Sequence, residues 1–287
     1  MNKKSLSNTE PILVVPDVHL RIETLKRVLA AWGEQGEVIF LGDFFDDFDD
    51  TPSRNREMAE MLRDEILPNP LHTVLMGNHD LHYHPACPSE LWCSGFHPDK
   101  KEVIGDVLGG DQFSLFKWAH SWDGVLFTHA GLHPRLVPAL SGGGADELAE
   151  WIGRSCRTAL DTRDSSEPLL RAGRMRGGYQ PVGGVIWMDA REYQPISGLR
   201  QIFGHTPMRK AMDLDSRTDG SWCIDTNLDS VVVMRGGAHD VSIINTRGID
   251  SKSLGEVGGR TFSKLDGGRG GGSKGQSSAR ANCTRSL

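Results

Sequence analysis

The stretch that decides the fold is Glu37-Val38-Ile39-Phe40-Leu41-Gly42-Asp43-Phe44-Phe45-Asp46-Asp47. It begins with a short apolar run at 38–41, whose β-branched and aromatic side chains predict a buried strand that stops at Gly42. Asp43 follows the end of that strand directly. Open α/β sheets place their ligand sites beyond the carboxyl ends of their strands. We therefore expect Asp43 to mark a site.

The same arrangement recurs at four other places in the chain. Apolar runs that end in Asp, Asn or His are 12–16 before Asp17-Val18-His19, 73–76 before Gly77-Asn78-His79-Asp80, 125–128 before His129-Ala130-Gly131, and 201–203 before Gly204-His205-Thr206. One such fragment alone is weak evidence, because each is also typical of an ordinary turn. Five of them, each closing a predicted strand, are hard to obtain by accident and indicate one shared site.

Helices are predicted between several of these strands. Apolar residues recur at helical spacing over 22–32, and Gly33 ends that helix; Thr51-Pro52-Ser53 begins a second helix that ends near Pro68. A third covers about 146–160. Strand–helix–strand units favour parallel pairing. The short β-rich runs 221–225, 231–234 and 241–244 are assigned to a second, mainly antiparallel sheet packed on the first.

Length and composition predict one folded α/β domain with disordered ends. The chain has 287 residues, of which 38% are hydrophobic and 24% charged, and no run is long enough to cross a bilayer. We predict a disordered N-terminus at 1–10, a folded domain at 11–248 with an irregular cap at 82–122, and a disordered Gly/Ser-rich basic tail at 249–287. The polar first ten residues are no secretory signal, and five scattered cysteines predict reduced thiols, so we expect a cytoplasmic protein.

The charge distribution disfavours nucleic acid as a partner. The net charge is -6, and the tail at 251–287 carries seven Lys/Arg and two Asp/Glu, so a tail of +5 leaves -11 on the rest of the chain. A body that acidic is a poor ligand for nucleic acid. Bound divalent cations would offset part of the excess. We expect neither nucleic acid nor a membrane as partner.

The residues at the strand ends have the chemistry of a dinuclear metal site. Asp, Asn and His suit Mn, Fe, Zn or Ni at sites of mixed nitrogen and oxygen ligands. Asp43 lies in the middle of the set and is the best placed carboxylate to bridge two ions. Two ions roughly 3.5–4 Å apart can share a hydroxide and clamp both oxygens of an in-line phosphoryl displacement. Such a site needs no serine or cysteine nucleophile.

With these motifs the chain resembles the calcineurin-like metallophosphoesterases, and within them the PPP-type serine/threonine protein phosphatases, in particular bacterial and phage members. The matching motifs are Asp17-Val18-His19, Gly42-Asp43-Phe44-Phe45-Asp46, Gly77-Asn78-His79-Asp80, His129-Ala130-Gly131 and Gly204-His205-Thr206, with Val185-Ile186-Trp187 and Ile224-Asp225-Thr226 as further similarities. The resemblance covers about residues 12–245. It implies a four-layer α/β/β/α sandwich with two mixed β-sheets and a metal site at the carboxyl ends of the strands.

The resemblance also implies a role for each site residue. A first metal would be held by Asp17, His19 and Asp43, and a second by Asp43, Asn78, His129 and His205. Manganese is the preferred ion, with Fe, Zn or Ni as alternatives. A metal-bridging hydroxide would attack phosphorus in line, His79 would protonate the leaving oxygen, and Asp46 would orient His79. A neighbouring carboxylate favours the protonated imidazole, which is the form that a general acid needs.

Two departures from the family pattern matter. Pro207 stands where many relatives in the wider superfamily have a second metal-binding His, which favours the PPP-like arrangement. Asp47 and Phe48 stand where that branch has Arg-Gly, so one phosphate-binding Arg is missing or displaced. A phosphoryl group in transit carries spread negative charge and calls for a replacement cation. The candidates are Arg191, near the place of a second phosphate-binding Arg in relatives, and Arg174 and Arg176, for which a solvated surface position is the stronger alternative.

Three functions are open on the sequence. The preferred one is a metal-dependent phosphomonoesterase whose partner is a phosphoprotein, modified on Ser, Thr or Tyr, or a small phosphorylated substrate. The second is a nucleotide or dinucleoside polyphosphate hydrolase, because the cap carries Trp92, Phe96, Trp118 and Trp122, which can stack on a base. The third is a non-catalytic scaffold, disfavoured because no ligand position is lost.

A cluster of His and Cys residues in the cap leaves one further alternative. Its members are His82, His84, Cys87, Cys93 and His97. Such residues are zinc ligands, but their spacing fits no standard zinc motif. A loop that lines the substrate cleft is the preferred interpretation.

Overall fold

A computed structural model describes residues 10–137, 143–214, 220–235, 240–249 and 254. The strands are β1 (Ile12–Val15), β2 (Val38–Phe40), β3 (His72–Val74), β4 (His120–Trp122), β5 (Val125–Phe127), β6 (Arg200–Phe203), β7 (Met212–Asp213), β8 (Trp222–Cys223), β9 (Ser230–Arg235) and β10 (Asp240–Asn245). The α-helices are α1 (Ile22–Trp32), α2 (Pro52–Met61), α3 (Asn78–Leu81), α4 (Pro98–Gly105), α5 (Gly110–Phe113) and α6 (Ala145–Thr162). Shorter turns of helix are η1 (Leu62–Ile66), η2 (Ser89–Leu91), η3 (Pro134–Leu136), η4 (Pro168–Leu170), η5 (Arg174–Arg176) and η6 (Ala190–Glu192).

The strands form two mixed sheets of five strands each. The first has the order β10-β9-β1-β2-β3 and the second the order β4-β5-β6-β8-β7. In the first sheet β1 pairs in parallel with β2, with Val14 opposite Ile39, and antiparallel with β9. In the second, β5, β6 and β8 are parallel and β4 and β7 are antiparallel edges. The carboxyl ends of β1, β2 and β3 therefore meet at one edge of the first sheet, and those of β5, β6 and β8 at one edge of the second.

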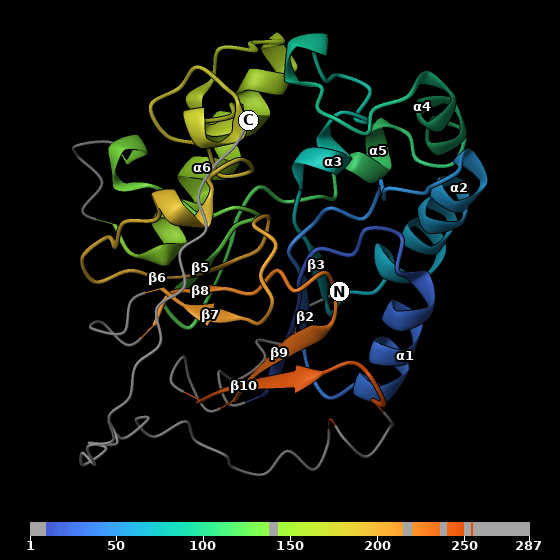
Figure 1. The fold of residues 1–287 in the computed structure, drawn as a ribbon, viewed down its shortest axis with the longest axis vertical. Helices are drawn as coiled ribbons and strands as arrows, with labels where there is room; N and C mark the ends of the chain where they lie inside the picture. The colour runs from blue at the N-terminus through green and yellow to red at the C-terminus, as the bar shows by residue number, and fades with distance from the viewer. Residues whose placement is uncertain (1–9, 138–142, 215–219, 236–239, 250–253, 255–287) are drawn as a thin grey trace, which may run out of the picture.

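Alternation along β1 explains why the two sheets form the centre of four layers. Ile12 and Val14 pack into the apolar core shared with Phe127 and Ile202 of the second sheet. Their neighbours point to the opposite face, because side chains alternate along a strand, and Leu13 joins the core on the helical side. Figure 1 shows α1 and α2 along the outer face of the first sheet, and α6 packs against β4 and β5 of the second. The predicted α/β/β/α sandwich with two mixed sheets is confirmed.

Most local predictions agree with the described elements. The helix predicted over 22–32 is α1, and the one predicted from Thr51 is α2, where Thr51 caps the first turn by accepting a hydrogen bond from the Arg54 N–H. The third predicted helix is α6. The segment at 82–122, which we predict to be a cap, consists of short helices, irregular chain and strand β4, with α4 packed against α2. Within the described residues no helix is long and apolar enough to span a membrane.

The assignment of the last β-rich runs to one second sheet was wrong for two of the three. Only the run at 221–225 contributes to the second sheet, as β8. The runs at 231–234 and 241–244 become β9 and β10 and extend the first sheet beside β1. The interior of β9 is buried on both faces, so it suits a central position, and apolar content alone does not identify which free edge it pairs with. The segments predicted to be disordered, 1–10 and 249–287, lie almost entirely outside the described residues.

Candidate active site

Sharp turns at the strand ends bring the predicted site residues together. His19, Asp43, Asp46 and His205 all have positive φ, at 42°, 51°, 64° and 67°. This left-handed region is costly for residues other than Gly, and such strain concentrates at functional sites. All four residues lie in the loops that follow strands β1, β2 and β6. The fold therefore maintains unfavourable backbone where the candidate ligands lie.

The first group of candidate ligands is Asp17, His19 and Asp43, whose donor atoms all lie within 4.8 Å of one another. The Nδ1–H of His19 donates to the carbonyl oxygen of Asp46 at 2.8 Å, which leaves Nε2 facing the Asp43 carboxylate at 3.7 Å. A hydrogen bond from one ring nitrogen to a backbone carbonyl is the usual way in which proteins orient a metal-binding His. The Asp17 carboxylate is fixed by the backbone N–H of His205 at 3.1 Å.

The second group shares Asp43 and adds His129 and His205, again with donor atoms within 4.8 Å of one another. Nδ1–H of His129 donates to the carbonyl oxygen of Leu41 at 2.8 Å. Its Nε2 therefore faces the acceptors around it, which are Oδ1 of Asn78 at 3.1 Å, Nδ1 of His205 at 3.2 Å and the Asp43 carboxylate at 3.4 Å. Four lone-pair donors converge on one point, with Asp43 common to both groups.

Charge in the site is unbalanced unless cations are bound. Burial lowers the pKa of His129, but Asp43 and Asp17 outweigh burial and raise it to about 10. His19 responds in the same way, with its pKa raised to about 9 against the effect of burial. Burial and the neighbouring Asp225 raise the pKa of Asp17 well above its usual range. Without metal, the site therefore takes up protons on groups that would otherwise serve as ligands.

These observations fit a pair of divalent cations. Metal binding releases protons from its ligands, and the raised pKa values of His19, His129 and Asp17 mean that a bound cation would compete with protons at these groups. Burial lowers the pKa of His205, so its imidazole is already in the neutral form that binds metal. The mixture of carboxylate, amide and imidazole donors suits Mn, Fe, Zn or Ni.

The Asp43 loop is held in place by groups beneath it. The Asp80 carboxylate accepts hydrogen bonds from the backbone N–H of Asp43 at 2.8 Å, Phe44 at 2.8 Å and Gly77 at 3.0 Å. Gly77 passes so close to Asp43 that an added Cβ would lie 2.1 Å from Oδ1, and Gly204 is in the same position relative to Asp17 at 2.0 Å. The glycines of the Gly-Asn-His-Asp and Gly-His-Thr motifs are therefore required by close approach to the ligands.

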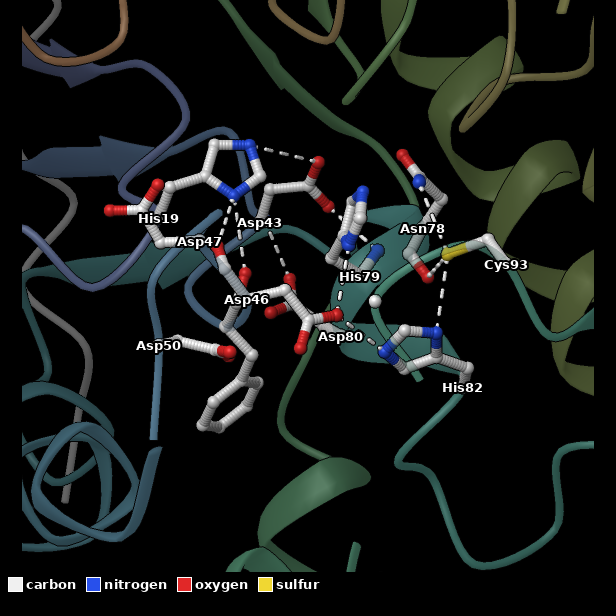
Figure 2. Close-up of polar contacts among 12 residues, drawn as sticks. His19, Asp43, Asp46, Asp47, Asp50, Asn78, His79, Asp80, His82 and Cys93 are labelled. Atoms are coloured by element: carbon white, nitrogen blue, oxygen red, sulfur yellow. Dashed lines mark hydrogen bonds and ion pairs between the residues drawn. The ribbon is translucent and has the colours of Figure 1, made fainter. Parts of the chain in front are cut away.

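His79 lies at the open side of this arrangement, and Asp46 orients it (Figure 2). The imidazole Nδ1 lies 2.9 Å from Asp46 Oδ2, and the backbone N–H of His79 donates to Asp43 Oδ1 at 2.9 Å. The His79 side chain keeps 21% of its surface exposed, so it faces solvent from beside the two ligand groups. An imidazole in this place can exchange a proton with a bound molecule.

Three further groups hold Asp46 and were missed by the sequence analysis. Its Oδ1 accepts hydrogen bonds from Tyr83 and Lys100, both at 2.6 Å, and its Oδ2 lies 2.9 Å from Nε2 of His82. Burial raises the pKa of Asp46, but His79, His82 and Lys100 outweigh it and hold the pKa far below its usual range. Lys100 lies on α4, deep in the irregular cap, and nothing in its sequence context indicates this long-range contact.

The three candidate phosphate-binding arginines are placed differently. Arg176 donates to Thr206 Oγ1 at 3.0 Å and to the His205 carbonyl oxygen at 3.2 Å, while its Nε lies 3.0 Å from Asp189. Arg191 pairs with Asp189 at 2.8 Å, and 68% of its side chain is exposed. Arg174 is exposed. Of the three, the described contacts bring only Arg176 against the loop that carries a candidate ligand.

Comparisons with known proteins agree with this arrangement. The sequence matches the family model of calcineurin-like phosphoesterases over residues 10–232. No curated protein matches the sequence. The fold is similar to that of a cold-active protein-tyrosine phosphatase of a psychrophilic Shewanella, at 12% identity over 84% of this chain and 79% of the other, with a TM-score of 0.51.

Two other solved structures were also matched. A mutant of a cold-active protein tyrosine phosphatase has 13% identity over 84% of this chain and 79% of its own, with a TM-score of 0.51. A protein serine/threonine phosphatase from Saccharomyces cerevisiae has 14% identity over 83% and 79%, with a TM-score of 0.49. At these identities the likeness extends to the fold alone.

Proposed function

Because the chain belongs to the calcineurin-like phosphoesterases, which makes it a metal-dependent phosphoesterase, we propose that it is a dinuclear phosphomonoesterase acting on phosphorylated Ser and Thr in proteins. The proposed ligands of the first ion are Asp17, His19 and Asp43, and those of the second are Asp43, Asn78, His129 and His205. Manganese is the proposed ion. Two such cations would supply Lewis acidity toward the phosphoryl oxygens and would activate the attacking water.

The position of His79 is the observation that carries the proposal. Its ring is held by Asp46 at 2.9 Å and is partly exposed beside both ligand groups. With Nδ1 bonded to Asp46, the ring presents Nε2 to a bound ester, where it donates a proton to the leaving oxygen. The alkoxide that leaves from phosphoserine or phosphothreonine is strongly basic, so an acid at this point is most valuable for these esters.

Arg176 is proposed to replace the phosphate-binding Arg that related phosphatases have directly after the residue matching Asp46. Asp47 stands where related phosphatases have a phosphate-binding Arg. Arg176 is held against the loop that carries His205 by Thr206 and Asp189. Its guanidinium retains unused N–H groups in this geometry and can bind phosphate oxygens. Arg191 and Arg174 remain weaker candidates because both are exposed.

The nucleotide alternative has little support from the cap. Trp118 is 4% exposed and is therefore unavailable to stack on a base. Trp122 packs against the core between the two sheets. Trp92 is exposed, but its ring already stacks on Phe96 at a centroid distance of 3.9 Å. The scaffold alternative loses support because every candidate ligand and His79 are present and converge.

A substrate panel tests the proposal. Purified protein would be assayed with Mn, Ni, Zn and Mg against a phosphoserine peptide, a phosphotyrosine peptide, an aryl phosphate and a dinucleoside polyphosphate. We expect manganese to give the highest turnover and the phosphoserine peptide to be the best peptide substrate. Faster cleavage of the dinucleotide than of any monoester would contradict the proposal. We also propose that residues 11–248 form the catalytic domain with 82–122 as its cap, and that the protein acts in the cytoplasm.

A further inference from the structure

Of the five His and Cys residues in the cap, three make only local hydrogen bonds, and the other two belong to one cluster. Nδ1 of His84 accepts a hydrogen bond from the Ala86 N–H, and His97 caps the start of α4. Cys87 donates to the carbonyl oxygen of Pro88. His82 and Cys93 instead come together, and with His79 they place three donor atoms within 4.8 Å of one another.

We propose that Cys93, His82 and His79 form a separate site for a single thiophilic cation, of which Zn²⁺ is the representative, and that its occupancy withdraws His79 from proton transfer. The site shares no ligand with the dinuclear centre, but it adjoins that centre, because Cys93 Sγ lies 3.6 Å from Nδ2 and 3.6 Å from the carbonyl oxygen of Asn78. The inhibitory consequence rests on the proposed role of His79, whereas the existence of the site does not.

The orientation of His82 is that of a metal ligand. Its Nε2 lies 2.9 Å from Asp46 Oδ2 and its Nδ1 lies 3.2 Å from Cys93 Sγ (Figure 2). With its proton on Nε2, beside the carboxylate, His82 has its lone pair on Nδ1, on the side of the sulfur. In many zinc sites a carboxylate lies next to one nitrogen of a His ring whose other nitrogen binds the metal, and His82 has this arrangement. His82 is fully buried, so the pattern is fixed by its surroundings.

The same Asp46 carboxylate also orients His79, so one anion supports two imidazoles of the cluster. Asp46 Oδ2 lies 2.9 Å from both Nδ1 of His79 and Nε2 of His82. His79 and Cys93 each keep part of their surface exposed, which gives a cation a route of entry. Burial raises the pKa of the Cys93 thiol, so a cation that binds must displace the thiol proton to solvent as the metal–sulfur bond forms.

The donor atoms of the two sites select different ions. Thiolate and imidazole favour Zn²⁺ over Mn²⁺ and Mg²⁺, which prefer oxygen donors. The dinuclear centre contributes carboxylate and amide oxygens together with imidazoles, and no sulfur. Manganese would therefore occupy the catalytic centre and leave the cap site open. Zinc can also enter the nitrogen and oxygen ligands of the catalytic centre, so binding at the cap site is identified by its dependence on Cys93.

Cobalt spectroscopy tests the site without any activity assay. The full chain, carrying Cys283→Ser to remove the tail thiol, would be loaded with Mg²⁺ and titrated with Co²⁺ while the thiolate-to-cobalt charge-transfer band in the near ultraviolet is recorded. We expect the band to saturate at one thiolate-bound cobalt per chain, to be lost in Cys93→Ser and Cys93→Ala, and to be unchanged in Cys87→Ser. Loss of an outer-shell partner weakens metal binding roughly 10–100-fold, so His79→Asn, which removes a direct ligand, should weaken cobalt binding at least that much.

Zinc inhibition of the manganese-loaded enzyme tests the consequence. We expect Zn²⁺ to inhibit the wild type and Cys87→Ser, and Cys93→Ser to need about 100-fold more zinc. A charge-transfer band that is absent from the wild type, or unchanged in a folded Cys93→Ser, would overturn the site. Equal zinc sensitivity of Cys93→Ser and wild type would overturn the withdrawal of His79. A protein without phosphatase activity in any metal form would contradict the proposed function and leave the cobalt result valid.

Discussion

Replacing His79 by Asn should slow hydrolysis by a factor that grows with the basicity of the leaving group. The substitution removes the ring that Asp46 holds at 2.9 Å. It preserves the hydrogen bond from the residue 79 N–H to Asp43 Oδ1, because that donor belongs to the backbone. The proposed metal ligands therefore keep their geometry, and the change isolates proton donation.

The expected loss follows from what a general acid contributes. Positioned acids accelerate proton transfer by roughly 10²–10⁴-fold, which corresponds to about 3–5 kcal/mol of transition-state stabilisation. The full loss should appear with a phosphoserine peptide, whose leaving alkoxide must be protonated. An aryl phosphate with a weakly basic phenolate leaving group should lose about tenfold or less, since it departs with little help.

The assay is steady-state phosphate release with manganese on both substrates, with the metal content of each preparation measured. His97→Asn is the matched control, because His97 is an exposed cap histidine that only begins α4, where Asn is equally suitable. The ratio of the two losses decides the question. Equal losses on both substrates would refute the assignment of His79 as proton donor, whatever their size.

Three further results are expected. Removal of metal by a chelator should abolish turnover, and added Mn²⁺ should restore it, as followed by phosphate release; activity that survives complete removal of metal would contradict the dinuclear site. Arg176→Gln should lower kcat/KM by about 10–100-fold through a lost charge-assisted phosphate contact, whereas Arg191→Gln should change it less than about threefold, and the reverse order would exchange their roles. Asp46→Asn should lessen the acid sensitivity of folding. The pKa of Asp46 lies far below its usual range in the folded protein, so below about pH 4 only the unfolded chain binds this proton, and the free energy of unfolding of the wild type falls by up to about 1.4 kcal/mol per pH unit as pH decreases. Denaturant unfolding of the metal-free proteins between pH 3 and 5 should show this contribution in the wild type and its absence in Asp46→Asn; identical slopes would contradict it.

The strand-end residues were predictable because local sequence determines them. Each of the five apolar runs overlaps a strand, and an Asp, Asn or His follows it. The fold brings these residues together, and Asp43 belongs to both groups of candidate ligands. Parallel pairing places strand ends side by side, so a local pattern sufficed to predict a long-range cluster. The helices from Ile22 and Pro52 were predictable for the same reason, since apolar spacing and an N-cap are local signals.

What the sequence did not show depends on contacts between distant segments. Lys100 bonds Asp46 across 54 residues, and no periodicity or motif distinguishes this buried lysine from a surface one. The sequence analysis placed Asp80 in its motif but did not predict that its carboxylate accepts a hydrogen bond from the Asp43 N–H. The placement of β9 beside β1 reflects a choice between sheet edges that a buried apolar run leaves open.

The magnetic coupling between bound manganese ions tests the dinuclear centre most directly. Protein loaded with Mn²⁺ would be analysed for metal content and by electron paramagnetic resonance at low temperature. Two ions per chain roughly 3.5–4 Å apart, bridged by Asp43, should give the multiline spectrum of an exchange-coupled pair, and Asp43→Asn should lose it. A single bound ion, or two ions with the spectrum of isolated Mn²⁺, would contradict the account.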